Sequence, residues 1–481
     1  MTVTEALEKL KTYEQTSFAL GHAMGLLYYD GVTVAPKGAA AVRGDTSAEL
    51  SRIDYQLTTA PETVEMLETL MAAREELDAV TRRKVEEYWR SYDRTRRIPE
   101  EEFVAYQRLS IKADDVWQTA KETNDFALFE PYLQEMFDTL KRFARYWEPD
   151  KAPYETMLDN YERGLTIAAC DEFFAALRQK LVPLIQRVIA HADRVDDAPL
   201  HADFPIPIQR EFSDFVMDVM GIDRNHCTIG ETEHPFTINF SRDDVRITTH
   251  YLYELHTGRE LARSNLGTGV SMGIHESQSR FYENIIGRSR AFCSIIYPWL
   301  KEHFAPRLDH VTEDDFYRMI NKSEPSLIRT EADELTYCLH IMVRYELEKR
   351  MFDGSLTAHD LPAEWNRLYK EYLGIDVPDD RQGVLQDSHW ANGNIGYFPS
   401  YAIGSAYGAQ YLQEMSKELD VDAVVRSGDL TPINNWLEDR IWKHGCMKDP
   451  VALFESVCGK FDPACYVAYL EKKFTEVYGL S

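Results

Sequence analysis

The sequence predicts a mainly α-helical protein with one small β-hairpin. Apolar residues recur at spacings of three and four through most of its 481 residues, the period that places them on one face of a helix. Alternating β-branched and aromatic residues occur convincingly in one place, between residues 236 and 249. Hydrophobic residues make up 44% of the chain and charged residues 28%, which is ordinary for a globular protein with a sizeable core.

Long helices joined by short loops are expected in the first third of the chain. The clearest lies at 126–147, where large apolar residues recur at spacings of three and four. Asp30 and Gly31 are expected to end the first helix. The expected helices in this third are 4–29, 47–59, 61–77, 79–96, 99–117 and 126–147.

The rest of the chain is also expected to be helical, apart from the hairpin. Strands at 236–240 and 245–249 should pair around the turn 241–244. Gly404 and Gly408, four apart, predict a close approach between two helices. The expected helices are two within 153–191, then 209–220, 291–304, 330–352 capped by Thr330, 361–373, and several from residue 410 onward.

The charge balance argues against two classes of partner. The chain has 80 acidic and 53 basic residues, a net charge of −27, which repels nucleic-acid phosphates and anionic membrane surfaces. The N-terminus has no apolar signal region, and no run approaches the roughly eighteen apolar residues of a membrane span. We therefore expect a cytoplasmic protein that binds neither nucleic acid nor membranes.

The stretch 244–290 carries more side chains of the types that bind metals or act in catalysis than any other part of the chain. Within it, Glu276 precedes apolar residues at helical spacing, which places its carboxylate on the inner face of a helix. A buried carboxylate needs a partner, and the sequence offers two kinds. One is an arginine, at position 280, 288 or 290, and the other is a metal ion.

A metal ion at Glu276 would need further ligands. His250 and Glu254 stand four apart, so on a helix both side chains point the same way. Imidazole and carboxylate groups are ligands that zinc accepts, with a third protein ligand and an open position at a catalytic site. A single histidine on a helix is more often a hydrogen-bonded packing residue, so the pattern leaves both interpretations open.

Two later segments also contain candidate site residues. Arg329 stands just before an acidic helix start, where it either pairs with Glu331 or Asp333 or is held by these acids to bind a carboxylate in bidentate fashion. The segment 386–401 is polar, broken by glycines and rich in Asn, His and Tyr, which favours the wall of a site over the core.

Four motifs resemble those of the carboxypeptidase Taq family of metallocarboxypeptidases, peptidase family M32. The resemblance extends over nearly the whole chain, and the last motif has five fixed identities in eight residues. The motifs are DxRxT at 244–248, HES(G)Q at 275–278, the segment around a substrate-binding arginine at 328–333, and GxxQDxHW at 383–390.

The resemblance implies a fold and an activity. The fold is a helical saddle of two lobes around a deep substrate groove, usually in a homodimer, and the chain would be a single domain over 1–481 with possible sub-lobes at about 1–150 and 151–481. The activity is that of a zinc-dependent hydrolase that removes C-terminal residues from peptides. The implied site residues are Glu276 and His250 as metal ligands, Tyr401 as the phenol that stabilises the oxyanion, and Arg329, Arg246, Gln386 and His389 as substrate-binding residues.

The family's signature is absent from this sequence. Members carry His-Glu-x-x-His on a helix, with both histidines binding zinc and the glutamate acting as general base. No such pattern occurs in these 481 residues, and Thr249 runs directly into His250. By comparison with the family, a block of roughly five or six helical turns is missing close to His250.

His250 then corresponds either to the second histidine of the signature or to the end of the strand before it. The 26 positions between His250 and Glu276 suit the family's spacing and favour the first alternative. The first histidine ligand and the base have no counterpart, so activity is expected to be absent or strongly impaired. The chain is either a zinc carboxypeptidase, or a defective copy of one, or a non-catalytic relative that keeps the peptide groove and the dimer.

Overall fold

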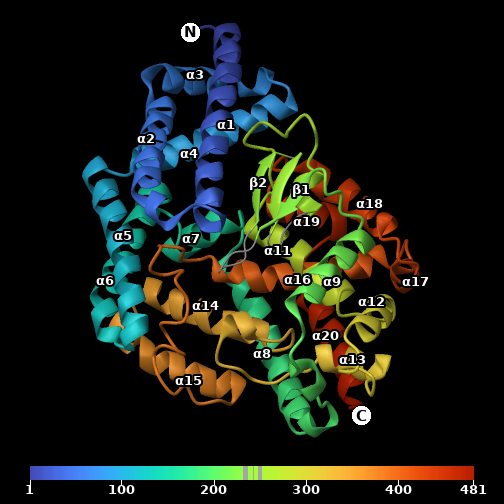
Figure 1. The fold of residues 1–481 in the computed structure, drawn as a ribbon. Helices are drawn as coiled ribbons and strands as arrows, with labels where there is room; N and C mark the ends of the chain where they lie inside the picture. Colours follow the sequence, from blue (N-terminus) through green and yellow to red (C-terminus); the bar gives the residue numbers. More distant parts are fainter. Residues whose placement is uncertain (231–236, 242, 248–251, 481) are drawn as a thin grey trace. The chain divides into compact units, whose positions relative to one another are not determined.

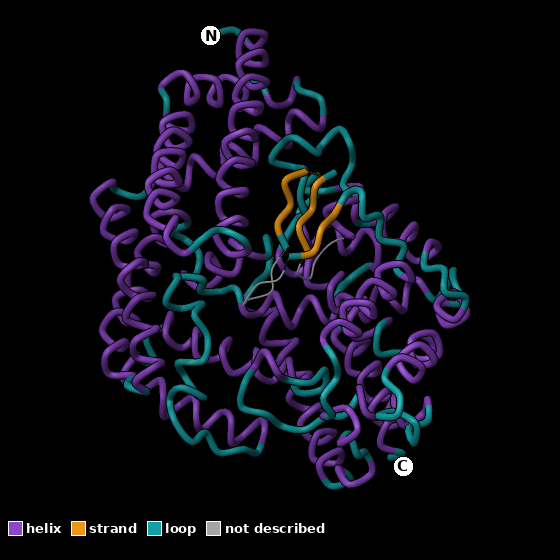
Figure 2. Tube along the Cα trace, in the orientation of Figure 1, coloured by secondary structure: helices purple, strands orange, loops and turns teal. Residues whose placement is uncertain are grey.

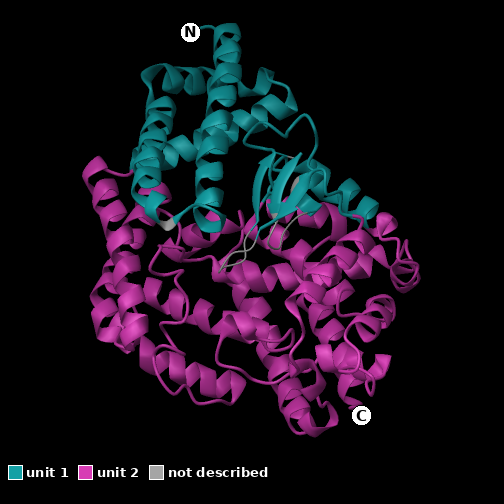
Figure 3. Cartoon of the chain, in the orientation of Figure 1, with its two compact units in different colours: residues 1–97, 222–270, 434–449 teal, residues 98–221, 271–433, 450–481 magenta. Residues whose placement is uncertain are grey.

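The computed structural model describes residues 1–230, 237–241, 243–247 and 252–480, and Figure 1 traces the chain. The described part is mainly α-helical with one small sheet (Figure 2), which confirms the predicted fold class. Within it, no helix is long and apolar enough to cross a bilayer. The chain forms two compact units (Figure 3): unit 1 holds residues 1–97, 222–270 and 434–449, and unit 2 holds 98–221, 271–433 and 450–481.

Unit 1 begins with α1 (Val3–Thr33), α2 (Ala40–Thr59), α3 (Pro61–Ala72) and α4 (Ala79–Arg97). The expected end of α1 at Gly31 is wrong, because the helix continues to Thr33 and Val34 N–H still donates to the Asp30 carbonyl. A single glycine weakens a helix by about 0.5–1 kcal/mol without ending it. The apolar core of these helices consists of Ala6, Leu10, Tyr13, Met66, Leu67, Leu70, Leu77 and Val85.

The sheet of unit 1 has three strands, β1 (Cys227–Ile229), β2 (Ile238–Ser241) and β3 (Asp244–Ile247), in the order β1-β3-β2. The antiparallel pairing of β2 with β3 confirms the predicted hairpin within the described residues. The parallel strand β1 was not predicted, because three residues are too few to show alternation. Helix α1 packs on β2, where Gly25 leaves room for the Phe240 ring.

Unit 2 is built around α14 (Tyr337–Asp353) and α16 (Phe398–Met415), which bury side chains on all sides. A helix that is buried all round lies at the centre of its unit. The other helices of unit 2 include α5 (Glu100–Thr123), α6 (Phe126–Trp147), α7 (Pro153–Tyr161), α8 (Ile167–Ile189), α9 (Ile206–Val219), α11 (Met272–Arg280), α12 (Arg290–His303), α13 (Glu313–Ile320), α15 (Leu361–Leu373), α17 (Val421–Arg426), α19 (Pro450–Cys458) and α20 (Pro463–Tyr478).

One predicted helix of unit 2 begins later than expected. The bounds of α6 and α15 agree with the prediction, but the helix expected from Thr330 begins at Tyr337. Ala332 is extended, and the Asp333 carboxylate accepts hydrogen bonds from Leu335 N–H and Thr336 N–H at 2.9 and 3.1 Å. An aspartate that binds backbone N–H groups ahead of a helix stabilises a helix start at that point.

Helices α11 and α16 approach each other closely, as the pair Gly404 and Gly408 predicts. A Cβ atom at Gly404 would lie 2.7 Å from Glu276 Cβ and 2.8 Å from the Gly273 carbonyl oxygen. At Gly408 the nearest atom to such a Cβ is the Ser277 carbonyl oxygen, at 3.3 Å. The two glycines therefore set the position of the helix that carries Glu276.

We expect Gly404→Ala to destabilise the protein by about 1–3 kcal/mol, the usual cost of overpacking. The added methyl group meets backbone and a Cβ atom, which have little freedom to move. Urea denaturation measures the change in the free energy of unfolding. Gly408→Ala is the matched control on the same helix, and a larger effect there than at Gly404 would contradict the prediction.

Candidate functional site

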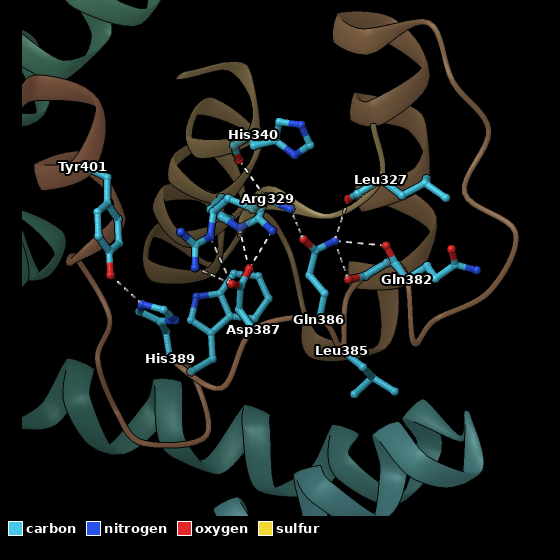
Figure 4. Close-up of polar contacts among 12 residues, drawn as sticks. Leu327, Arg329, His340, Gln382, Leu385, Gln386, Asp387, His389 and Tyr401 are labelled. Atoms are coloured by element: carbon cyan, nitrogen blue, oxygen red, sulfur yellow. Dashed lines mark hydrogen bonds and ion pairs between the residues drawn. The ribbon is translucent and has the colours of Figure 1, made fainter. Parts of the chain in front are cut away.

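Arg329, Asp387 and Arg344 form an ionic cluster in unit 2, and both arginines are buried. Figure 4 shows Arg329 with Asp387. Arg329 Nε and Nη2 donate to Asp387 Oδ1 at 3.0 and 2.8 Å, and Arg344 Nε donates to Oδ2 at 2.7 Å. Burial alone would raise the pKa of Asp387, but Arg344 and Arg329 outweigh it and hold that pKa well below its usual range. Two cations share one carboxylate, so the cluster is positively charged and attracts anions.

The partner of Arg329 is not one of the acids that the sequence suggested. Asp387 lies 58 residues away, whereas Glu331 is exposed and Asp333 binds the backbone before α14. The expectation that Glu331 and Asp333 hold the guanidinium is therefore wrong. Proximity in the sequence favoured them, and only the packing of α14 against the segment 383–397 brings Asp387 to the arginine.

Gln386 joins the segments on either side of this cluster. Its Oε1 accepts from Arg329 N–H at 3.0 Å, and its Nε2 donates to the Leu327 and Gln382 carbonyl oxygens at 3.2 and 3.0 Å (Figure 4). Both ends of the amide are thus engaged inside the protein. A contact between Gln386 and a substrate stays a prediction.

His389 and Tyr401 lie beside Arg329. His389 Nε2 is 3.2 Å from the Tyr401 hydroxyl, and the Tyr401 ring centre is 5.1 Å from the Arg329 guanidinium carbon (Figure 4). Burial and the neighbouring Tyr397 raise the pKa of Tyr401, so the phenol stays protonated and can donate a hydrogen bond. The structure thus brings together three predicted site residues, an arginine, an imidazole and a phenol.

Glu276 lies on α11, buried, with an arginine as its partner. Arg280 Nε donates to its Oε1 and Ser279 Oγ to its Oε2, both at 2.8 Å. The Arg280 guanidinium stacks on the Tyr337 ring at 4.0 Å, and the Tyr337 hydroxyl accepts from Arg329 Nη1 at 3.4 Å. Of the two kinds of partner that the sequence offered, the described contacts are those of the arginine, and they connect Glu276 to the ionic cluster.

A second buried carboxylate fixes the start of α11. Glu162 Oε2 accepts from Gly273 N–H at 3.0 Å, and the Ser271 hydroxyl accepts from Ile274 N–H at 3.1 Å. Burial raises the pKa of Glu162 to about 7, while bonds from Ser271 and Gly273 lower it. A carboxylate at a helix N-terminus binds the free N–H groups there and so anchors the helix.

A polar stripe on α14 was not predicted from the sequence. His340, Arg344 and Glu348 stand four apart and are fully buried, although α14 is otherwise largely apolar on its inner faces. His340 contacts a tyrosine of α15, Arg344 contacts Asp387, and Glu348 accepts from Trp390. Polar residues at a spacing of four among the buried apolar residues of this helix were the signal that could have revealed them.

The remaining predicted site residues belong to unit 1 or lie outside the described residues. Arg246 is in β3, where its Nε and Nη2 donate to the two Asp244 carboxylate oxygens at 2.5 and 2.8 Å. Its guanidinium also lies over the rings of Tyr29 and Phe240. A substrate contact from Arg246 stays a prediction, and His250 is not among the described residues.

Comparison with known proteins assigns the chain to a family. The family model described as Carboxypeptidase Taq (M32) metallopeptidase matches residues 9–474. The chain belongs to this family. Carboxypeptidase 1 of Bacillus subtilis is 37% identical, covering 98% of this chain and 99% of that protein, and thermostable carboxypeptidase 1 of Thermus thermophilus is 35% identical, covering both chains fully.

Solved M32 structures share the fold. The M32 carboxypeptidase from Deinococcus radiodurans aligns with a TM-score of 0.95 at 32% identity, covering 99% of this chain and all of that one. Metallocarboxypeptidase 1 of Trypanosoma cruzi aligns with a TM-score of 0.91 at 32% identity, covering 98% and 99% of the two chains. The resemblance that the motifs suggested is therefore confirmed.

Membership of the M32 family implies a metal cofactor, but the described residues do not fit one. A catalytic zinc takes three protein ligands, and the described part of the chain has no group of three His, Cys, Asp or Glu residues that could bind a metal ion. There, Glu276 contacts the Arg280 guanidinium, which competes with a cation for the same oxygen.

We expect Asp387→Asn to lower the free energy of unfolding by about 3–5 kcal/mol, because it leaves two buried guanidinium groups without a counter-charge. Since the folded pKa of Asp387 is depressed, its stabilisation is present above about pH 4 and is lost only as the pH falls further. Urea denaturation at neutral pH is the measurement.

Asp376→Asn is the control for this substitution, because Asp376 pairs with Lys370 and its side chain is 84% exposed. Exposed ion pairs contribute at most about 1 kcal/mol. Equal losses of stability in the two variants would show that the cluster around Asp387 contributes no more than a surface pair.

Proposed function

We propose that this chain is a carboxypeptidase-type protein that binds the C-terminal end of peptides at Arg329 and hydrolyses them weakly or not at all. The carboxypeptidase relatives support the substrate class, a peptide with a free C-terminal carboxylate. The charge and the hydrogen-bond donors of Arg329 support the binding site. The absence of His-Glu-x-x-His from the sequence supports the loss of hydrolysis.

The observation that carries the proposal is the hydrogen bonding of Arg329. Of its five N–H donors, two go to Asp387 and one to the Tyr337 hydroxyl. One N–H remains on each terminal nitrogen, which is the arrangement that a carboxylate accepts in bidentate fashion. The net positive charge of the cluster attracts an anion, and Asp387 holds the guanidinium in one orientation, which lowers the entropic cost of binding.

Two features of the sequence support impaired hydrolysis. His-Glu-x-x-His, which supplies two zinc ligands and the base in the family, does not occur in the chain. The alignments with the Bacillus and Thermus relatives extend over 498 and 511 positions, more than the 481 residues of this chain, so both contain residues without a counterpart here. Without the signature glutamate, the chain has no general base at the position where the family carries one.

The second candidate function is a working zinc carboxypeptidase. It is favoured by the presence of Glu276, Arg329 and Tyr401 together in unit 2, linked through Arg280 and Tyr337. Zinc would then have to displace Arg280 from Glu276 and find its other ligands outside the described residues. The homodimer, the single-domain organisation and the cytoplasmic location remain further proposals, supported by the family and by the acidic composition.

We expect Arg329→Ala to weaken binding of an N-acylated dipeptide with a free C-terminus by at least about tenfold, because charge-assisted contacts to the carboxylate are lost. Isothermal titration calorimetry measures the dissociation constant. A dipeptide with an amidated C-terminus should bind as weakly to the unaltered protein. Arg367→Ala is the matched control, since Arg367 is an exposed arginine of α15 that pairs with Glu364 and Glu371.

Zinc analysis after equilibrium dialysis distinguishes the two functions. We expect much less than one zinc ion per chain and no release of the C-terminal amino acid from the same dipeptide. Stoichiometric zinc together with release of that amino acid would establish the zinc carboxypeptidase instead. Equal affinity for the free and the amidated dipeptide would reject recognition of the carboxylate.

A further inference from the structure

The segment 387–397 is attached to α14 at both of its ends. At the first end, Asp387 pairs with Arg344 of α14. Further along, Trp390 Nε1 and Gly396 N–H both donate to Glu348 of α14, at 2.7 and 3.0 Å. Between these attachments lies His389, which contacts Tyr401 beside Arg329.

Glu348 is placed to hold this segment through hydrogen bonds. The Glu348 side chain is fully buried. Besides the two hydrogen bonds from the segment, its Oε2 accepts one from the Tyr154 hydroxyl of α7 at 2.8 Å. A carboxylate buried with three hydrogen-bond donors fixes the donors' positions strongly, since each would be costly to leave unpaired. Glu348 takes no part in the interactions on which the proposed function is argued.

The geometry next to Gly396 shows how little freedom the segment has. Gly396 has φ = +87°, and a Cβ atom there would lie 2.7 Å from the Met157 carbonyl carbon. The next residue, Tyr397, packs its ring 5.5 Å from the His389 ring and 4.9 Å from the Tyr401 ring. Moving Gly396 would therefore move the aromatic side chains that surround His389.

We propose that Glu348 is a positioning residue which, together with Arg344, sets where His389 and Tyr401 lie relative to Arg329. The inference rests on the proposed function, since its consequence is the affinity for a peptide C-terminus. Glu348 does not touch the ligand. It acts through Trp390 and Gly396, which hold the segment that carries His389.

The groups around Glu348 set the pKa of its carboxyl group. Burial raises the pKa of Glu348 to about 7, while bonds from Trp390, Tyr154 and Gly396 and the charge of Arg344 lower it. Two tyrosines that face Glu348, Tyr154 and Tyr161, do not change charge near neutral pH, because burial raises their pKa values.

Isothermal titration calorimetry with the N-acylated dipeptide tests the effect on binding. At about pH 8.5, where Glu348 is ionised, we expect Glu348→Gln to bind at least about tenfold more weakly, because an amide cannot accept from all three donors. Tyr154→Phe is the matched control: it removes one donor from the same carboxylate and leaves both bonds to the segment, so its affinity should stay within about threefold.

Tryptophan indole resonances give a second readout that does not depend on peptide binding. In protein labelled with ¹⁵N-tryptophan, we expect the N–H signal of Trp390, identified by its loss in Trp390→Phe, to shift with pH around 7 as Glu348 ionises. The signal should not shift in Glu348→Gln. A residue that merely fills space would produce no such titration.

The outcomes separate this inference from the proposed function. If the unaltered protein fails to bind the dipeptide, the proposed function fails, and the Trp390 titration alone decides whether Glu348 holds the segment. If Glu348→Gln does not fold, Trp390→Phe replaces it in calorimetry and should show the same weakening. Unchanged affinity in the folded variants, or a Trp390 signal that does not respond to pH, would overturn the positioning role.

Discussion

The ion pairs between Asp387 and two buried arginines are the interaction on which the site in unit 2 depends. Arg329 precedes Asp387 by 58 residues and Arg344 precedes it by 43, so one carboxylate connects three distant parts of the chain. Removing charges from water is costly, and removing either partner leaves a charge buried without compensation. The positions of the two arginines and of Asp387 are therefore strongly fixed relative to one another.

The same cluster connects with the carboxylate that the family resemblance assigns to a metal. Glu276 binds Arg280, Arg280 stacks on Tyr337, and Tyr337 accepts a hydrogen bond from Arg329. Close contact between α11 and α16 at Gly404 holds this series of contacts in place. An arginine supplies the positive charge at Glu276 in the described site.

Helix α14 contributes three buried polar side chains, those of His340, Arg344 and Glu348, to the surroundings of the site. Its three buried polar side chains are paired with groups on α15, on the segment 387–397 and, for Glu348, on α7. Polar groups that are paired in a low-dielectric interior are held rigidly, because each would carry a desolvation penalty if it lost its partner. Such a network is well suited to placing His389, which lies on a segment without regular secondary structure.

The sequence by itself determined the helical class, the hairpin, the bounds of helices such as α6, the close approach at Gly404 and the family, because periodicity, glycine spacing and motifs are local properties. It did not determine which acid holds Arg329, that Glu276 contacts Arg280 rather than another arginine, or that Glu348 binds Trp390 and Gly396. These pairings join residues from different elements, so only the tertiary structure decided them: a buried charge pairs with whatever the packing brings within hydrogen-bonding distance, and the sequence does not record that distance.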